Sequence, residues 1–196
     1  MSTLAASERR EARRRRLLDA ALQLFAEVGY HDTSVDDVVA KARTSKSAFY
    51  EYFESKEDCF RVLLEQEGGA LVAAVNTAAA AGVDHRDRMR RGIHAFVTAC
   101  IGRSRVARLL LVESVGLSPS IEEVRHRLHD EFAKLAEQAV RYAQEHGDQG
   151  LVGIDPAVYG RVIVGAVNEA TIWYLETGAS DGAATLADQI CRTLSV

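Results

Sequence analysis

Apolar residues recur along the chain at intervals of three and four positions, and no segment shows a convincing strand pattern. The first such stripe consists of Leu17, Ala21, Leu24, Phe25 and Val28. This spacing places apolar side chains on one face of a helix. The stripe predicts an amphipathic helix over about residues 9–28, and Gly29 is suited to end it because glycine tolerates a left-handed conformation.

The same reading along the rest of the chain predicts an all-α protein of about nine helices. After the first, the expected helices cover about residues 35–42, 46–53, 56–81, 86–102, 104–115, 120–146, 156–176 and 182–194. Ser34, Ser45 and Ser55 precede helical segments as N-caps, and Pro156 is suited to the first helical position. We therefore expect a three-helix domain over residues 1–58 and a larger helical domain over residues 59–196.

The second and third helices, joined by a short turn, have the proportions of a helix-turn-helix unit over about residues 34–53. Phe49 and Phe53 mark the inward face of the third helix, and a projection at about 100° per residue turns Ser47 and Ala48 away from them. Small residues there would bring the helix backbone close to base edges.

Polar side chains around this helix fit contacts to DNA. Lys46, Tyr50 and Tyr52 can bond phosphates or bases, and Lys56 can meet a phosphate. The alternative is that the two tyrosines cover a small core, because short helical triplets are common. The pattern alone leaves both interpretations open.

Charge is distributed unevenly, although the net charge of the chain is −4. Residues 1–50 carry a net charge of +2 and the remainder −6, and six arginines lie between positions 9 and 16. This asymmetry indicates one basic contact surface on an acidic body, or a solvated arginine-rich helix start.

Other signals narrow the class of protein. The three cysteines are scattered without CxxC spacing, which argues against a disulfide framework and a cysteine zinc site. No apolar run is long enough to span a membrane, so we expect a cytoplasmic protein. No phosphate-binding loop, nucleophile elbow or zinc-protease motif is present, so we expect no enzyme and no cofactor.

Many residues of the N-terminal segment resemble, in type and spacing, the signature of the TetR family of transcriptional regulators. The matching positions are Leu18-Asp19-Ala20-Ala21-Leu22, Leu24-Phe25-Ala26-Glu27-Val28-Gly29-Tyr30, Thr33-Ser34-Val35, Val38, Ala42, Ser45-Lys46, Phe49-Tyr50, Tyr52-Phe53 and Ser55-Lys56-Glu57. The resemblance covers about residues 10–60. It implies a homodimeric, ligand-responsive repressor that binds an inverted-repeat operator in double-stranded DNA.

The resemblance places the recognition helix over Ser45 to Tyr52. The DNA-contacting set that we predict is Thr44, Ser45, Lys46, Ser47, Ala48, Tyr50, Tyr52 and Lys56. Arg43, Thr44 and Ser47 replace the Gly, Val and Gly that are frequent in the family, and Glu51 adds an acidic group. These departures leave the operator sequence open.

The larger domain offers a dimer interface and a ligand site. Residues 157–175 are apolar on two sides, so we expect a homodimer through about residues 156–194. A small hydrophobic ligand, with a polar or cationic group for Asn168 or Glu169, is expected between the helices. The candidate ligand-binding residues are Phe96, Cys100, Asn168, Glu169 and Trp173.

Several of these candidate residues also have an ordinary structural explanation. For two of them we favour a different interpretation, in which Glu169 pairs with an arginine and Trp173 packs at the interface. The reason is that buried charges are usually paired. His126, His129 and Asp130 have a spacing that can hold a metal, but flanking arginines favour a solvated face and we predict no metal site. A helical dimer with an enzymatic or scaffold role, and without DNA binding, is the alternative function.

Overall fold

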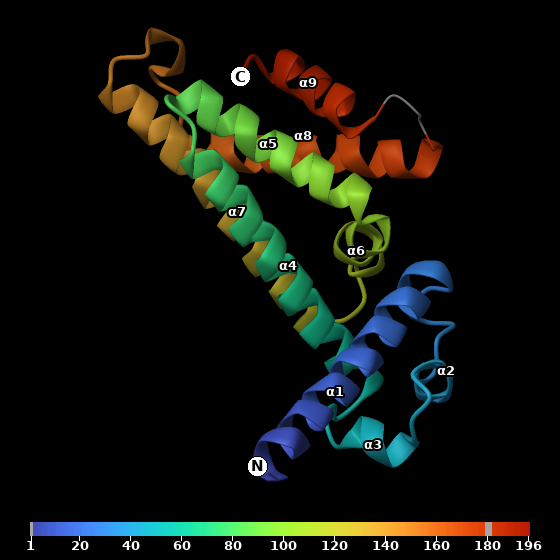
Figure 1. The fold of residues 1–196 in the computed structure, drawn as a ribbon. Coiled ribbons are helices and arrows are strands. Elements are labelled where there is room, and N and C mark those ends of the chain that lie inside the picture. Colours follow the sequence, from blue (N-terminus) through green and yellow to red (C-terminus); the bar gives the residue numbers. More distant parts are fainter. Residues whose placement is uncertain (1, 179–181) are drawn as a thin grey trace.

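The computed structural model describes residues 2–178 and 182–196, and every regular element within them is helical (Figure 1). The α-helices are α1 (Ser2–Glu27), α2 (Val35–Lys41), α3 (Lys46–Tyr50), α4 (Lys56–Ala80), α5 (His85–Gly102), α6 (Ser104–Arg108), α7 (Pro119–Glu145), α8 (Pro156–Thr177) and α9 (Ala183–Leu194). The predicted all-α fold, with a small N-terminal helix group and a larger body, is confirmed. Within the described residues, no helix is both long and apolar enough to cross a bilayer.

Several elements differ from the sequence expectation. The helix α1 begins at Ser2 rather than near residue 9, and α3 ends at Tyr50 rather than near residue 53. The helix predicted over residues 104–115 divides into α6 and a π-helical segment, η1 (Leu109–Glu113). A short 3₁₀ turn, η2 (Gln149–Leu151), lies where we expected only a break between helices. Hydrophobic periodicity predicts that a segment is helical, but the wider π-helical turn depends on tertiary contacts.

Serine side chains begin the short N-terminal helices. Ser34 and Asp37 form a complete capping box, in which the Asp37 N–H donates to Ser34 Oγ at 3.2 Å and the Ser34 N–H donates to Asp37 Oδ2 at 2.9 Å. Ser45 accepts from the Ala48 N–H at the start of α3, and Ser55 accepts from the Asp58 N–H at the start of α4. The Asp58 carboxylate accepts from the Glu54 N–H rather than from the Ser55 N–H, so the start of α4 lacks the reciprocal bond that completes the capping box of α2. These local bonds explain why short helices begin where the sequence places them.

The N-terminal helices are held together by aromatic side chains. Phe25, Phe49, Phe53 and Phe60 are among the largest fully buried side chains. The Phe25 and Phe60 ring centroids lie 5.3 Å apart, and those of Phe49 and Phe53 lie 5.2 Å apart. Phe60 belongs to α4, so this core extends past the domain boundary that we proposed near residue 58. Rings of this size supply much of the apolar burial available to so small a group of helices.

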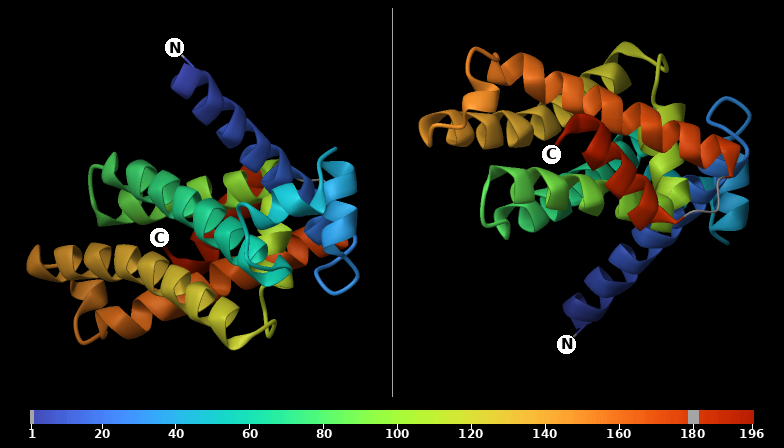
Figure 2. Two further views of the ribbon diagram at one scale, coloured as in Figure 1. Left: turned by 90° about the horizontal axis from the view of Figure 1, so that it is seen from below. Right: turned by 90° about the horizontal axis from the view of Figure 1, so that it is seen from above.

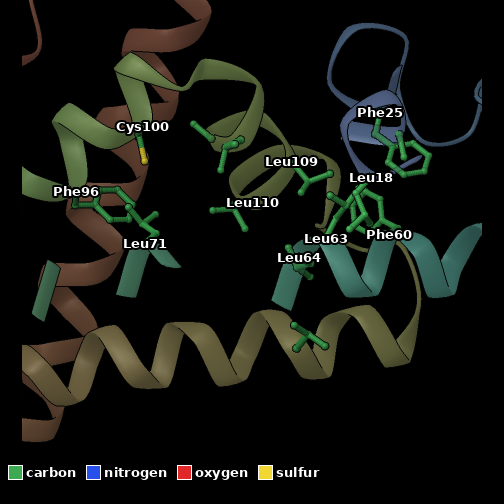
Figure 3. Close-up of a cluster of buried hydrophobic side chains, with 14 of the residues drawn as sticks. Leu18, Phe25, Phe60, Leu63, Leu64, Leu71, Phe96, Cys100, Leu109 and Leu110 are labelled. Atoms are coloured by element: carbon green, nitrogen blue, oxygen red, sulfur yellow. The ribbon is translucent and has the colours of Figure 1, made fainter. Parts of the chain in front are cut away.

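The segment η1 joins the N-terminal group to the body. Leu109 and Leu110 lie between the side chains of α1 and the first turns of α4 on one side and those of the body on the other (Figure 3). The Glu113 carboxylate accepts a hydrogen bond from the Tyr30 N–H at 3.2 Å, directly after α1. The N-terminal half of α1 instead extends away from the body (Figure 2).

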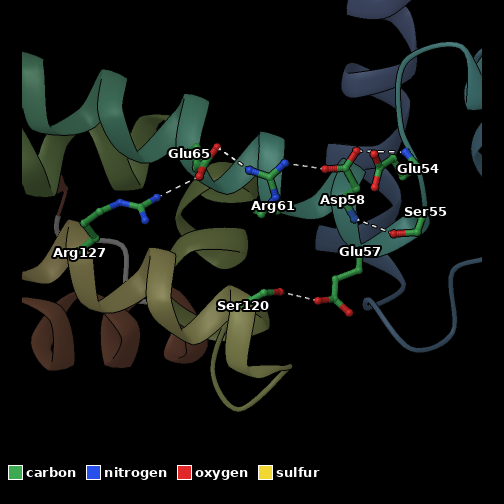
Figure 4. Close-up of polar contacts among 8 residues, drawn as sticks. All are labelled: Glu54, Ser55, Glu57, Asp58, Arg61, Glu65, Ser120 and Arg127. Atoms are coloured by element: carbon green, nitrogen blue, oxygen red, sulfur yellow. Dashed lines mark hydrogen bonds and ion pairs between the residues drawn. The ribbon is translucent and has the colours of Figure 1, made fainter.

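Polar contacts join the N-terminal halves of α4 and α7, and together they are called the polar seam here. Glu57 accepts hydrogen bonds from Ser118 and Ser120, and these bonds hold the pKa of Glu57 below its usual value. Farther along, Glu65 pairs with Arg127 at 2.9 Å (Figure 4). The seam aligns the two helices side by side.

The helices α7 and α8 pack closely at Gly160. A Cβ atom at this position would lie 2.4 Å from the Ala133 carbonyl oxygen. The absence of a side chain therefore sets the distance between the two helix backbones. The helices α4, α5, α7 and α8 together enclose the interior of the body, and α9 packs on α5 (Figure 1).

Candidate nucleic-acid interface and ligand cavity

The helix α3 lies with α2 at one end of the molecule, far from α8 and α9 (Figure 1). Ser47 and Tyr50 are exposed, and the Tyr50 side chain is 54% exposed although its ring contacts the buried Phe49 edge-on. The Tyr50 side chain is therefore half exposed while its ring is held against the core. Covering the core and contacting DNA are both compatible with this position, so the DNA-contacting role of Tyr50 stays a prediction.

The turn before α3 is made by Arg43, which has a φ of 51°. This left-handed conformation is one that glycine adopts without strain, and glycine is frequent in the family at this position. The Thr44 N–H then donates to the Val39 carbonyl at 2.9 Å, and the Thr44 side chain is half-buried. Ser45 is exposed but its hydroxyl is engaged as the cap of α3.

Lys46 is exposed and bridges α3 to α2. Its Nζ lies 2.9 Å from Asp36 Oδ2, and this hydrogen bond raises the pKa of Lys46. Ion pairs between exposed groups contribute little to stability. The ammonium is therefore free to exchange a carboxylate for a phosphate at small cost.

Ala48 does not lie on the outward face as predicted, because its side chain is only 5% exposed. The projection assumed that the helix packs on one side, through Phe49 and Phe53. The helix α3 is only five residues long and contacts α2 as well as the aromatic core. A second covered face buries Ala48, and its small size allows the close approach.

Tyr52 and Lys56 are engaged within the fold rather than turned toward an external phosphate. The Tyr52 hydroxyl donates to the Arg10 carbonyl at 3.0 Å. Lys56 Nζ donates to the carbonyls of Tyr30 and Thr33 at 2.8 and 2.7 Å, and lies 4.2 Å from the centre of the Tyr30 ring. Burial lowers the pKa of Lys56. Both side chains fasten α1 and its following loop to the residues between α3 and the start of α4.

The basic residues of α1 lie near the same end of the molecule. Arg13 pairs with Glu51 at 3.5 Å, so the acidic group that departs from the family pattern is met by an arginine. Arg15 and Arg16 are exposed. Arg13 thus lies beside the end of α3, and a basic contact surface formed by the arginines of α1 stays a prediction.

A cavity of about 170 Å³ lies in the body between α4, α5, α7 and α8. Its wall is mostly apolar. The lining residues are Val75, Asn76, Ala79, Ala80, Arg88, Met89, Gly92, Ile93, Phe96, Phe132, Leu135, Ala136, Gln138, Ala139, Ile163, Val164, Val167 and Asn168. An apolar cavity lined by the fifth and eighth helices is what the sequence predicts.

Two of the five candidate ligand residues line this cavity, namely Phe96 and Asn168. Cys100 is buried outside the lining, and burial raises the pKa of its thiol to about 12. Glu169 and Trp173 are exposed on the outer side of α8, with Trp173 56% exposed. Glu169 forms no ion pair with another described residue of the same chain, so its pairing with an arginine stays a prediction.

Sequence reasoning missed Arg88, which is the one charged residue that lines the cavity in the described part of the chain. It stands in the run of arginines at positions 86, 88, 90 and 91. No sequence signal separates it from the others, because which of them faces inward depends on how α5 packs.

The histidines considered for a metal site have other surroundings. His126 is exposed, whereas His129 is half-buried and its Nε2 lies 3.3 Å from the Asn168 side-chain amide nitrogen. No group of three or more candidate metal ligands comes together among the described residues.

Comparison with known proteins matches both regions. Residues 17–63 match the profile described as bacterial regulatory proteins of the tetR family, and residues 82–195 match the profile described as a tetracyclin repressor-like C-terminal domain. The chain belongs to the TetR family. Members of this family are transcriptional regulators, which sets aside the enzyme alternative.

Individual TetR relatives match this chain over different lengths. The transcriptional activator FasR of Mycolicibacterium smegmatis is 34% identical over 87 residues, which are 44% of this chain and only 40% of FasR. The repressor DhaR of Mycobacterium sp. GP1 is 27% identical over 68% of each chain. The structure of FadR from Bacillus subtilis, in complex with stearoyl-CoA, has a TM-score of 0.83 at 17% identity and covers 91% of this chain and 96% of FadR. This last likeness is one of fold.

Proposed function

We propose that the protein is a ligand-released transcriptional repressor that binds an inverted-repeat DNA operator as a homodimer. The observation that carries the proposal is the exposure of Tyr50, Ser47 and Lys46 together, on a short helix at one end of the molecule. A helix in this position enters the major groove with its exposed residues toward base edges and flanking phosphates.

Each member of the recognition surface has a distinct contribution. Ser47 faces the bases, while Tyr50 and Lys46 bond phosphates, and Thr44 and Ser45 sit at the start of the helix, where backbone N–H groups meet phosphates. Tyr52 and Lys56 contribute indirectly, by holding α1 and the loop over residues 29–34 in place. Ala48 contributes by letting α3 approach α2.

The dimer forms through the outer face of α8 together with α9. Val158, Val162 and Trp173 are each more than half exposed, at 59%, 58% and 56%. Because they are separated by four and eleven residues, they share one face of the helix. A two-fold axis along this face places the two recognition helices on successive half-sites of an inverted repeat.

Ligand control acts through the cavity in the body. A small apolar molecule that binds better to a conformation with the wrong spacing of the recognition helices weakens DNA binding by its differential affinity. The stearoyl-CoA bound to B. subtilis FadR, which has the same fold, supports an acyl ligand. The contact of Glu113 with the Tyr30 N–H offers a direct mechanical link from the body to the end of α1.

The test begins with selection of bound duplexes from a random library, followed by footprinting of the selected sequence. We expect an inverted repeat and protection of two successive major grooves. Tyr50→Phe should weaken binding several-fold on every duplex, because it removes one phosphate hydrogen bond. Tyr159→Phe, which removes a hydroxyl in α8, is the matched control and should bind as the parent does. Failure to select any duplex would refute the proposal.

A further inference from the structure

The charge that the cavity presents is positive, which is opposite to the charge expected from Glu169. Arg88 is the one charged side chain among the described lining residues, and Asn76 and Gln138 line the cavity as well. Glu169 is exposed on α8 and does not line it. A ligand with a cationic group would therefore meet an arginine and no carboxylate.

Arg88 also differs from the arginines beside it in having no carboxylate partner among the described residues. Asp87 pairs with both Arg90 and Arg91, at 2.6 and 2.7 Å. Arg86 lies 3.9 Å from Asp148. Among the described residues, the one hydrogen bond that the Arg88 side chain donates is a long one of 3.4 Å, from Nε to the Gly82 carbonyl.

The Arg88 guanidinium is held in place without an ion pair to a described carboxylate. Its Cζ lies 5.2 Å from the centre of the Tyr142 ring, and a guanidinium stacked on an aromatic face keeps its N–H edges available. Gly82 packs so closely on Arg88 that a Cβ there would lie 2.6 Å from the Arg88 backbone nitrogen. Such an arginine is suited to bind an oxyanion through two parallel hydrogen bonds.

The cavity has an apolar region two helical turns along α5 from Arg88. Phe96 meets Phe132 there edge-on, with ring centroids 5.4 Å apart. The polar lining group in this region, Asn168, is within hydrogen-bond distance of His129. The cavity therefore has a cationic end and an apolar end.

We propose that the ligand is an amphiphilic anion, in which a carboxylate or phosphate pairs with Arg88 and an apolar chain extends toward Phe96 and Phe132. This inference rests on the proposed ligand control and names the chemistry of the ligand. A cavity of about 170 Å³ is close to the ~150 Å³ apolar cavity that holds benzene, so the chain is of short to medium length.

The test measures direct binding to the full chain by isothermal titration calorimetry. The probes are octanoate, octanoyl-CoA and 1-octanol, which share a chain and differ in the head group. We expect at least one of the anions to bind about tenfold more tightly than 1-octanol, as a charge-assisted hydrogen bond provides. Tight binding of octanoate identifies the carboxylate as the head group, and tight binding of octanoyl-CoA alone identifies the phosphates.

Substitutions then assign the preference to one side chain. Arg88→Gln should abolish the tenfold preference and leave 1-octanol binding unchanged. Arg91→Gln is the matched control, because Arg91 is an exposed arginine of the same helix outside the cavity lining. Arg88→Lys, which keeps the charge, should retain a preference for the anion and serves if the glutamine variant does not fold.

Three results would overturn the inference. They are unchanged anion binding by folded Arg88→Gln, equal affinity for 1-octanol and both anions, and no binding of any probe. The proposed function is tested separately, by DNA binding without a ligand. Arg88-dependent binding of an anion by a chain that binds no DNA would refute the proposed function and leave this inference standing.

Discussion

The recognition unit, which consists of α1, α2, α3 and the start of α4, differs from the body in how completely its interior is filled. Around α1–α3, four phenylalanines are fully buried in direct contact with their neighbours, and the polar groups of Tyr52 and Lys56 are engaged with backbone carbonyls. The body leaves a cavity among α4, α5, α7 and α8, with an arginine at its wall. A filled core fixes the geometry that a DNA surface requires, whereas an unfilled one admits a ligand and can change shape.

The largest expected effect is on stability, when a phenylalanine is truncated to alanine in each of the two interiors. Phe49→Ala should destabilise the protein by about 3–5 kcal/mol, since it removes a fully buried ring and leaves a void. Phe96→Ala should cost less, because Phe96 already borders a cavity. Urea unfolding of both variants checks the difference. Equal losses would mean that the cavity wall is as tightly packed as the recognition core.

The next effect probes the closest helix contact in the body. Gly160→Ala should destabilise by about 1–3 kcal/mol, because the new Cβ would overlap the Ala133 carbonyl oxygen, a backbone atom that cannot turn aside. The control is Gly69→Ala in α4, where a Cβ would meet nothing within 4 Å. It should stabilise by about 0.5–1 kcal/mol through helix propensity. Thermal unfolding gives both values, and a stable Gly160→Ala would show that α7 and α8 can separate freely.

A substitution at Lys56 tests whether this side chain stabilises the fold or contacts DNA. Lys56→Met should lower the free energy of unfolding by about 1–2 kcal/mol, because two loop carbonyls lose their donor. The salt dependence of DNA binding should keep its slope, since no phosphate contact is removed. A slope reduced by about one unit, with unchanged stability, would restore the phosphate role predicted from the sequence.

The smallest effect concerns pH and belongs to the body. Burial lowers the pKa of His129, as do Arg125 and His126, while Asp130 and Glu122 oppose the shift. The unfolded chain, with a histidine pKa near 6.5, then binds more protons than the folded one. Stability from this group is present above about pH 6.5 and declines as the pH falls through 6.5 toward the lowered value. His129→Gln should flatten that part of the stability curve, and an unchanged curve would contradict the assignment.

Much of the recognition unit follows from the sequence because its determinants are local. The serine caps bond N–H groups three residues away, and the apolar stripe of α1 is a repeat of three and four positions. The phase of α3 set by Phe49 correctly turns Ser47 outward, whereas it left the position of Tyr50 open. The same phase failed for Ala48, because a second covering helix, α2, is not visible in the spacing within α3.

The sequence by itself therefore determined the helical fold, the starts of the serine-capped helices, the inward positions of Phe49 and Phe53, and the presence of an apolar body. Tertiary structure alone decided that Arg88 faces the cavity, that Glu169 and Trp173 lie outside it, and that Lys56 turns inward. The physical reason is the range of the interactions. Helix periodicity and capping act over three or four residues, whereas the cavity wall gathers residues from 75 to 168, and its charge depends on how those distant helices rotate against one another.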